Sequence, residues 1–184
     1  MIITISGYAG SGKSTVAKFL AQRLNLKHYS IGDLFREIAR EKNISIVELN
    51  KMLESDATID DMLDKKQADL GKKEDNFVID GRLAALFIPH AKVKVFLDAD
   101  EEIRAQRILK ESRNVEKSSS IQDAINKIRT REESEIKRYT KLYNFNCYDR
   151  NKYNIVINTT KISPEEVVGK IISEMEKKNG NKEE

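Results

Sequence analysis

The sequence predicts an α/β fold in which helices cover both faces of a parallel sheet. Short β-branched runs alternate with helical segments along the chain, which is typical of parallel strands joined by helices. The run from Val93 to Leu97 is apolar enough for a strand buried on both faces. The expected strands are residues 2–6, 27–30, 77–80, 93–99 and 155–160.

Length and composition indicate one domain, residues 1–184, in a reducing compartment. The chain is 39% hydrophobic, and its net charge of +3 is too balanced for a nucleic-acid-binding module. The single cysteine, Cys147, excludes an internal disulfide and is interpreted as a small apolar filler. No signal peptide or run of ~18 apolar residues is present in the sequence. We therefore expect a cytoplasmic monomer without membrane or nucleic-acid partners.

Two stretches interrupt the alternation of strands and helices. Residues 33–73 show only helical patterns, and within them Ser45 and Glu48 have the spacing of a capping box. Residues 114–120 are polar and are interpreted as a mobile loop. Open α/β sheets bind ligands beyond the carboxyl ends of their strands, so we expect both stretches to border such a site.

A phosphate-binding loop is predicted between the first strand and the first helix. The motif G-x-x-x-x-G-K-[ST] is met in full, and the donor site is expected to comprise Gly7, Tyr8, Ala9, Gly10, Ser11, Gly12, Lys13, Ser14 and Thr15. Glycines let backbone N–H groups surround phosphate oxygens, and the following helix points its positive end at them. Lys13 would reach the β- and γ-phosphates of ATP, and Ser14 would offer a hydroxyl to Mg²⁺.

Among proteins with this loop, a compact kinase fits best. Guanine recognition needs Asn-Lys-x-Asp after a strand, whereas residues 151–154 lack the Asp and precede a strand. An oligomeric ATPase motor generally needs a larger domain. A kinase must hold two highly charged phosphates together, which requires several cations from separate elements. The candidates are Arg36, Arg82, Arg104, Arg107 and Arg113.

The helix after residues 114–120 adds Arg131 and Arg138. At ~100° per residue the two side chains lie about 20° apart on one face, with Glu135 beside them. Like charges stacked in this way cost stability unless an anion lies between them, so a phosphate is expected there. The alternative is neutralisation by Glu132 and Glu135 on a wet face.

A carboxylate for Mg²⁺ is expected at the end of a strand. Asp80 ends the third expected strand and is followed at once by Gly81 and Arg82, which favours it. Asp98, at the end of the fourth, is the competitor. Either carboxylate could instead cap a helix.

The chain resembles the nucleoside-monophosphate kinases, and among them the archaeal type of cytidylate kinase, over nearly its whole length. The resemblance is carried by residues 7–15, 30–37, 80–84, 131–139 and 153–159. It implies a P-loop kinase fold, with a five-stranded parallel sheet in the order 2-3-1-4-5. Residues 33–73 would be the monophosphate-binding insert, and residues 114–120 part of a short lid. The implied reaction transfers the γ-phosphoryl group of ATP to CMP or dCMP.

The resemblance also implies roles for individual residues. Arg36 would hold the acceptor's phosphate, and Arg82 would meet the acceptor near its base. Arg131 and Arg138 have the seven-residue spacing of the family's pair that clamps the transferring phosphoryl group and the acceptor. Glu135 stands where the family has an acidic group near the ribose.

Arg107 resembles an arginine on the adenine side of the donor.

Many archaeal members have Gly-Thr-Thr-Thr at residues 12–15, whereas this chain has the ordinary ATP-binding loop. Adenylate kinases usually have Asp-Gly-Phe-Pro-Arg where residues 80–84 stand, which argues against AMP. The open alternatives are AMP, UMP or an alcohol as acceptor, the alcohol needing Asp33 as general base, and an ATP-dependent binding switch.

Overall fold

The computed structural model describes residues 1–110 and 118–180, which form one five-stranded parallel sheet and its covering helices. The strand order β2-β3-β1-β4-β5 confirms the predicted order. The strands are β1 (Ile2–Gly7), β2 (Lys27–Ser30), β3 (Phe77–Asp80), β4 (Val93–Asp98) and β5 (Ile155–Asn158). The helices are α1 (Lys13–Arg23), α2 (Ile31–Glu41), α3 (Ile46–Met52), α4 (Thr58–Lys73), α5 (Ala84–Phe87), α6 (Glu101–Lys110), α7 (Ile121–Tyr143) and α8 (Pro164–Gly180).

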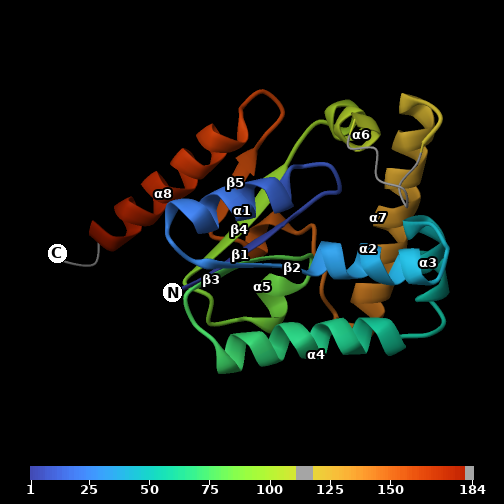
Figure 1. The fold of residues 1–184 in the computed structure, drawn as a ribbon, viewed down its shortest axis with the longest axis horizontal. Coiled ribbons are helices and arrows are strands. Elements are labelled where there is room, and N and C mark those ends of the chain that lie inside the picture. The colour runs from blue at the N-terminus through green and yellow to red at the C-terminus, as the bar shows by residue number, and fades with distance from the viewer. Residues whose placement is uncertain (111–117, 181–184) are drawn as a thin grey trace.

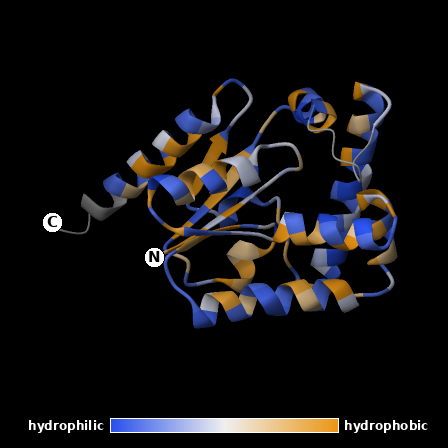
Figure 2. Ribbon diagram, viewed as in Figure 1, coloured by the Kyte–Doolittle hydropathy of each residue, from blue (hydrophilic) through white to orange (hydrophobic). Residues whose placement is uncertain are grey.

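Helices cover both faces of the sheet (Figure 1). α1 and α8 pack together on one face, and α4 and α5 lie on the other. β1, β3 and β4 are mostly hydrophobic, whereas the edge strand β2 is polar and the helices alternate between polar and apolar residues (Figure 2). Apolar clusters accordingly form on both sides, with Leu20 and Ile171 on the α1–α8 side and Leu49, Phe77 and Ile88 on the other.

The expected strands agree with the observed strands to within two residues at their ends. β5 stops at Asn158 because its side-chain oxygen accepts the N–H of Thr160 at 2.9 Å and turns the chain. β4 stops at Asp98 for the same reason, since the Asp98 carboxylate accepts the N–H of Ala99 at 2.8 Å.

As predicted, the helices and strands of residues 33–73 are all helices. They are most of α2, together with α3 and α4. Ser45 and Glu48 form the expected capping box at the start of α3. α3 packs on α7, so these helices form a wall beyond the carboxyl ends of the strands (Figure 1). The expected lid falls largely on residues 114–117, which, like Arg113, lie outside the described residues.

The surroundings of Cys147 agree with its interpretation as a small apolar filler. Cys147 is buried among the rings of Phe96 and Tyr153, and this burial raises the pKa of its thiol to about 12, as befits a filler rather than a nucleophile. Within residues 1–110 and 118–180, no helix has the length and apolar character to cross a membrane.

The first position of the phosphate-binding loop should accept no side chain. Gly7 has φ +142°, and a Cβ there would lie 2.0 Å from the carbonyl oxygen of Leu97. We expect Gly7→Ala to lower the free energy of unfolding by about 2 kcal/mol, measured by urea denaturation. Gly169 is the matched control, because a Cβ there meets nothing within 4 Å inside α8. Gly169→Ala should raise stability by about 0.5 kcal/mol, and equal effects of the two changes would contradict this account.

Candidate active site

The phosphate-binding loop joins β1 to α1 and lies at the carboxyl edge of the sheet. Gly10 and Gly12 have φ values of +76° and +87°, a region that costs other residues strain. A Cβ on Gly10 would also lie 2.5 Å from the carbonyl oxygen of Arg104, so the loop packs too closely on α6 for a side chain. Because Gly12 is the N-cap of α1, the first backbone N–H groups of that helix face the loop's interior and favour an anion.

Lys13 lies inside this loop. Its ammonium group donates a hydrogen bond to the carbonyl oxygen of Tyr8 at 2.6 Å. Burial, followed by the nearby charge of Arg82, lowers the pKa of Lys13 well below its ordinary value. A bound polyphosphate would reverse that shift by supplying the opposite charge.

A cavity opens between this loop, the end of β3 and helices α2, α4 and α7. Its volume is about 90 Å³. This is smaller than the roughly 300–1,000 Å³ that is usual for ligand pockets. The predicted site residues that line the cavity are Ala9, Gly10, Gly12, Lys13, Ser14, Thr15, Arg36, Asp80, Arg82, Arg131 and Glu135.

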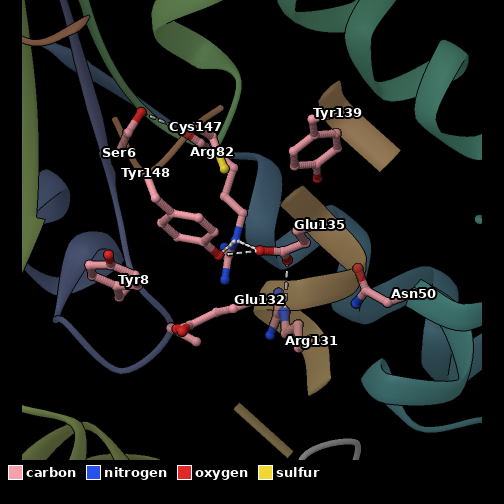
Figure 3. Close-up of polar contacts among 12 residues, drawn as sticks. Ser6, Tyr8, Asn50, Arg82, Arg131, Glu132, Glu135, Tyr139, Cys147 and Tyr148 are labelled. Carbon is pink, nitrogen blue, oxygen red and sulfur yellow. Dashed lines mark hydrogen bonds and ion pairs between the residues drawn. The ribbon is translucent and has the colours of Figure 1, made fainter. Parts of the chain in front are cut away.

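A buried carboxylate joins the cations of this cavity (Figure 3). Glu135 on α7 accepts hydrogen bonds from Arg82 Nε and the Tyr148 hydroxyl, and from Arg131 Nε at 2.9 Å. Burial opposes its ionisation, but the charges of Arg82 and Arg131 dominate and lower the pKa of Glu135 to about 2. The Arg82 Nη2 atom is buried and has no hydrogen-bond partner among the described residues, so this guanidinium can bind a further anion.

Aromatic stacking connects this cluster to the phosphate-binding loop. The ring of Tyr8, in the loop, stacks on Tyr148 with the centroids 4.6 Å apart and the planes 8° from parallel. The guanidinium of Arg104 lies 4.6 Å from the centroid of Tyr8 and pairs with Glu132. Tyr148 therefore links the phosphate-binding loop to Glu135, because it stacks on Tyr8 and its hydroxyl donates to Glu135. The sequence did not reveal this link.

Asp80 lies against the start of α1. Its Oδ2 accepts hydrogen bonds from Ser14 at 2.8 Å and from Ser30 at 3.1 Å, and its Oδ1 lies 2.8 Å from His28 Nε2. Asp98, the competitor, pairs instead with Arg150 and does not line the cavity. The sequence did not predict His28 as a site residue. It lies near Asp80 because β2 and β3 are neighbours in the sheet, with Ser30 opposite Asp80.

Other predicted residues lie beside the cavity rather than on its surface. Arg138 donates to the backbone oxygen of Asn50 at 3.1 Å and forms an ion pair with Asp60 at 2.5 Å. Arg131 pairs with Glu135 and Arg138 with Asp60, so each of the two arginines has a carboxylate neighbour. Glu132, offered from the sequence as a neutralising partner, pairs with Arg104 instead.

Further predicted residues lie outside the cavity surface. Arg107 donates to the Thr159 carbonyl at 2.7 Å, and its Nη1 lies 3.4 Å from the Gly10 carbonyl, so it holds the phosphate-binding loop against the loop after β5. Asp33 pairs with Arg36, and its side chain is 65% exposed. Ser11, like Gly7, is buried in the frame of the loop.

Sequence reasoning missed a polar face of α4. Asp60, Asp64 and Gln67 are buried and line the cavity. Burial raises the pKa of Asp60 to about 6 and that of Asp64 to about 7. Their spacing of four and then three residues is the signal that could have placed them on one helix face.

Solved structures show which class of protein has this fold. The structure of shikimate kinase from Aquifex aeolicus aligns with this chain with a TM-score of 0.58 at 22% identity. The alignment covers 96% of this chain and 96% of the shikimate kinase chain. For shikimate kinase from Bacteroides thetaiotaomicron, the alignment covers 96% of this chain and 98% of that protein's chain, with a TM-score of 0.66 at 17% identity. At these identities the likeness concerns the fold alone. Fold and phosphate-binding loop together define a P-loop kinase.

The chain belongs to the cytidylate kinase-like family, whose model matches residues 2–161. Cytidylate kinase from Natronomonas pharaonis is 42% identical over 168 residues, which cover 91% of this chain and 85% of that protein. Cytidylate kinase from Methanobrevibacter smithii is 38% identical over 94% of this chain and 97% of that protein. These relatives confirm the family resemblance that the sequence motifs predicted.

The buried carboxyls of α4 should make stability fall as the pH rises. Because the pKa of Asp64 is raised from an ordinary 3.8 to about 7, the folded protein binds more protons than the unfolded chain between those values. Raising the pH from about 5 to about 8 should therefore lower the free energy of unfolding in both proteins, as measured by urea denaturation. The loss should be larger in the wild type than in Asp64→Asn, by at least about 1 kcal/mol. Equal losses in the two proteins would show that Asp64 does not titrate in this window.

Proposed function

We propose that the protein is a cytidylate kinase that transfers the γ-phosphoryl group of ATP to CMP or dCMP, giving ADP and the diphosphate. The observation that carries this is the convergence of cations on one cavity. Lys13 from the phosphate-binding loop, Arg36 from α2, Arg82 after β3 and Arg131 from α7 all line it. Two polyanions brought together need such a set, and family membership supports cytidylate as the acceptor.

The transfer is direct and in line, without a covalent enzyme intermediate. The acceptor's phosphate oxygen is already a nucleophile, so no strong general base is required. Catalysis then rests on positioning and on cations aimed at the charge of the transferred group. Arg36 would hold the acceptor's phosphate, and Arg131 would meet the transferred group. The insert of residues 33–73 and a lid at residues 114–120 would close over both substrates and exclude water.

Three further residues have proposed roles. Arg138 would support the clamp, and its contacts with Asn50 and Asp60 would hold it there. Glu135 would approach the acceptor's ribose while it holds Arg82. Arg107 is assigned to the adenine side of ATP, because it lies where the phosphate-binding loop meets the loop after β5.

Ser14 and Asp80 would hold Mg²⁺. The two side chains are adjacent, with Ser14 Oγ donating to Asp80 Oδ2 at 2.8 Å, and both line the cavity. The described residues contain no group of three or more His, Cys, Asp or Glu that could hold a metal ion. This donor set suits Mg²⁺, which keeps waters and phosphate oxygens as ligands rather than an all-protein cage. When bound, the ion neutralises charge on the β- and γ-phosphates.

An alcohol acceptor is less well supported by the geometry. It would require a general base, and the candidate, Asp33, is paired with Arg36 and lies outside the residues that line the cavity. One chain supplies both the loop and the arginines, so we assign the activity to a monomer. The lone buried thiol of Cys147 suits the cytoplasm.

A panel of acceptors tests the proposal. ADP release from ATP and Mg²⁺ should be fastest with CMP or dCMP, slower with UMP and AMP, and absent with shikimate. Release that no acceptor stimulates would indicate a nucleotide-dependent switch and overturn the assignment.

Removing the ammonium group of the loop should slow the reaction. Lys13→Ala should lower kcat by on the order of 10²-fold or more, because a preorganised donor at the transferred group is lost. Lys18→Ala is the matched control, since Lys18 is exposed on the same helix. Near-normal turnover in Lys13→Ala would contradict the scheme.

A further inference from the structure

Gln67 on α4 places an unused hydrogen-bond acceptor at the cavity. Its side chain is 2% exposed and lines the cavity. The Nε2 atom donates to Asp64 Oδ1 at 3.2 Å and to the Leu63 carbonyl oxygen at 3.4 Å. The Oε1 atom is buried and has no hydrogen-bond partner among the described residues. Such an atom destabilises the protein unless something pairs with it.

The orientation of this amide is fixed by its neighbours. The Leu63 carbonyl oxygen can only accept, and so can the Asp64 carboxylate in its ionised form, so the nitrogen faces both and the oxygen faces away. Asp64 is itself held, because the Tyr143 hydroxyl donates to its Oδ2. The series Tyr143, Asp64, Gln67 therefore determines that an acceptor, not a donor, is presented at the cavity.

The surroundings of Oε1 favour a base rather than a phosphate. Asp60 and Asp64 lie on the same helix face, and either carboxylate would repel an anion when ionised. Ile31, Phe35 and Leu63 offer apolar surface for a flat ring. The absence of a side chain on Gly81 leaves room beside this oxygen, since a Cβ there would lie 3.2 Å from Oε1 and 3.1 Å from Ile31.

We propose that Gln67 Oε1 accepts a hydrogen bond from the exocyclic amino group of cytosine, and that Asp64 positions the amide for this contact. Gln67 thereby becomes a specificity-determining residue that separates CMP from UMP. Uracil carries a carbonyl oxygen in place of that amino group, so two acceptors would face each other without a proton. The inference rests on the proposed cytidylate kinase activity and assigns the reading of its base to α4.

Gln67→Met tests the contact with nearly the same side-chain volume. The kcat/KM for CMP should fall roughly tenfold or more, while kcat/KM for UMP stays the same or rises, because only the amino group loses a partner. The KM for ATP should not change. Gln122→Met is the matched control, since Gln122 is exposed on α7 and bonds only to Asn126 in the described contacts.

Asp64→Asn tests the positioning role with a readout that a merely structural role would not move. The Tyr143 hydroxyl should keep the oxygen of the introduced amide in place, which leaves the nitrogen of that amide facing Gln67. Gln67 would then turn its oxygen toward residue 64 and its nitrogen toward the cavity, at the cost of the 3.4 Å bond to Leu63. The variant should therefore gain activity on UMP and lose activity on CMP, lowering the CMP-to-UMP ratio of kcat/KM by roughly tenfold or more.

The outcomes separate the inference from the function on which it rests. A wild-type protein inactive on CMP overturns both. A wild type that is active on CMP but does not discriminate against UMP overturns the inference alone. So does an unchanged CMP-to-UMP ratio in the folded variants. Equal losses on CMP and UMP in Gln67→Met, with dCMP less affected than CMP, would show that Gln67 contacts the ribose instead. If Gln67→Met does not fold, Asp64→Asn decides alone.

Discussion

The ion pairs of Glu135 are the interaction on which the rest of the site depends. A kinase of this type must keep several cations close together before any phosphate is present, and like charges in a poorly hydrated cavity repel strongly. Glu135 compensates Arg82 and Arg131 at once, and the Tyr148 hydroxyl satisfies it further. A single buried carboxylate thus stabilises the arginines while leaving Arg82 Nη2 unpaired among the described residues. Breaking such a buried pair typically costs about 3–5 kcal/mol.

The parallel sheet explains how distant segments meet at this carboxylate. β1 and β3 are neighbours in register, with Ile5 opposite Asp80, so the phosphate-binding loop and the Asp80–Arg82 turn leave the sheet side by side. α7 and the insert helices close the remaining sides. The loop is fixed by close backbone contacts at Gly7 and Gly10. These contacts define the donor side of the site.

The sequence could predict what is encoded locally or by family resemblance. Strand ends, the Ser45 capping box and the phosphate-binding loop follow from short-range patterns, and the strand order followed from the resemblance. Helical periodicity placed Arg131 and Arg138 on one face beside Glu135, which pairs with Arg131. It could not identify Asp60 as the partner of Arg138, because Asp60 comes from another helix. The same limit hid Gln67, whose importance lies in an unpaired atom, and the stacking of Tyr8 on Tyr148, which depends on tertiary packing.

Calorimetric titration of CMP into Glu135→Gln tests the central claim most directly. Glu132→Gln is the matched control, since it removes a carboxylate on the same helix that pairs with Arg104 and does not line the cavity. With both variants folded, the account predicts that CMP affinity falls by roughly tenfold or more in Glu135→Gln and by much less in Glu132→Gln. Unchanged CMP affinity in folded Glu135→Gln would contradict the claim that this carboxylate holds Arg82 and Arg131 in place for the substrates.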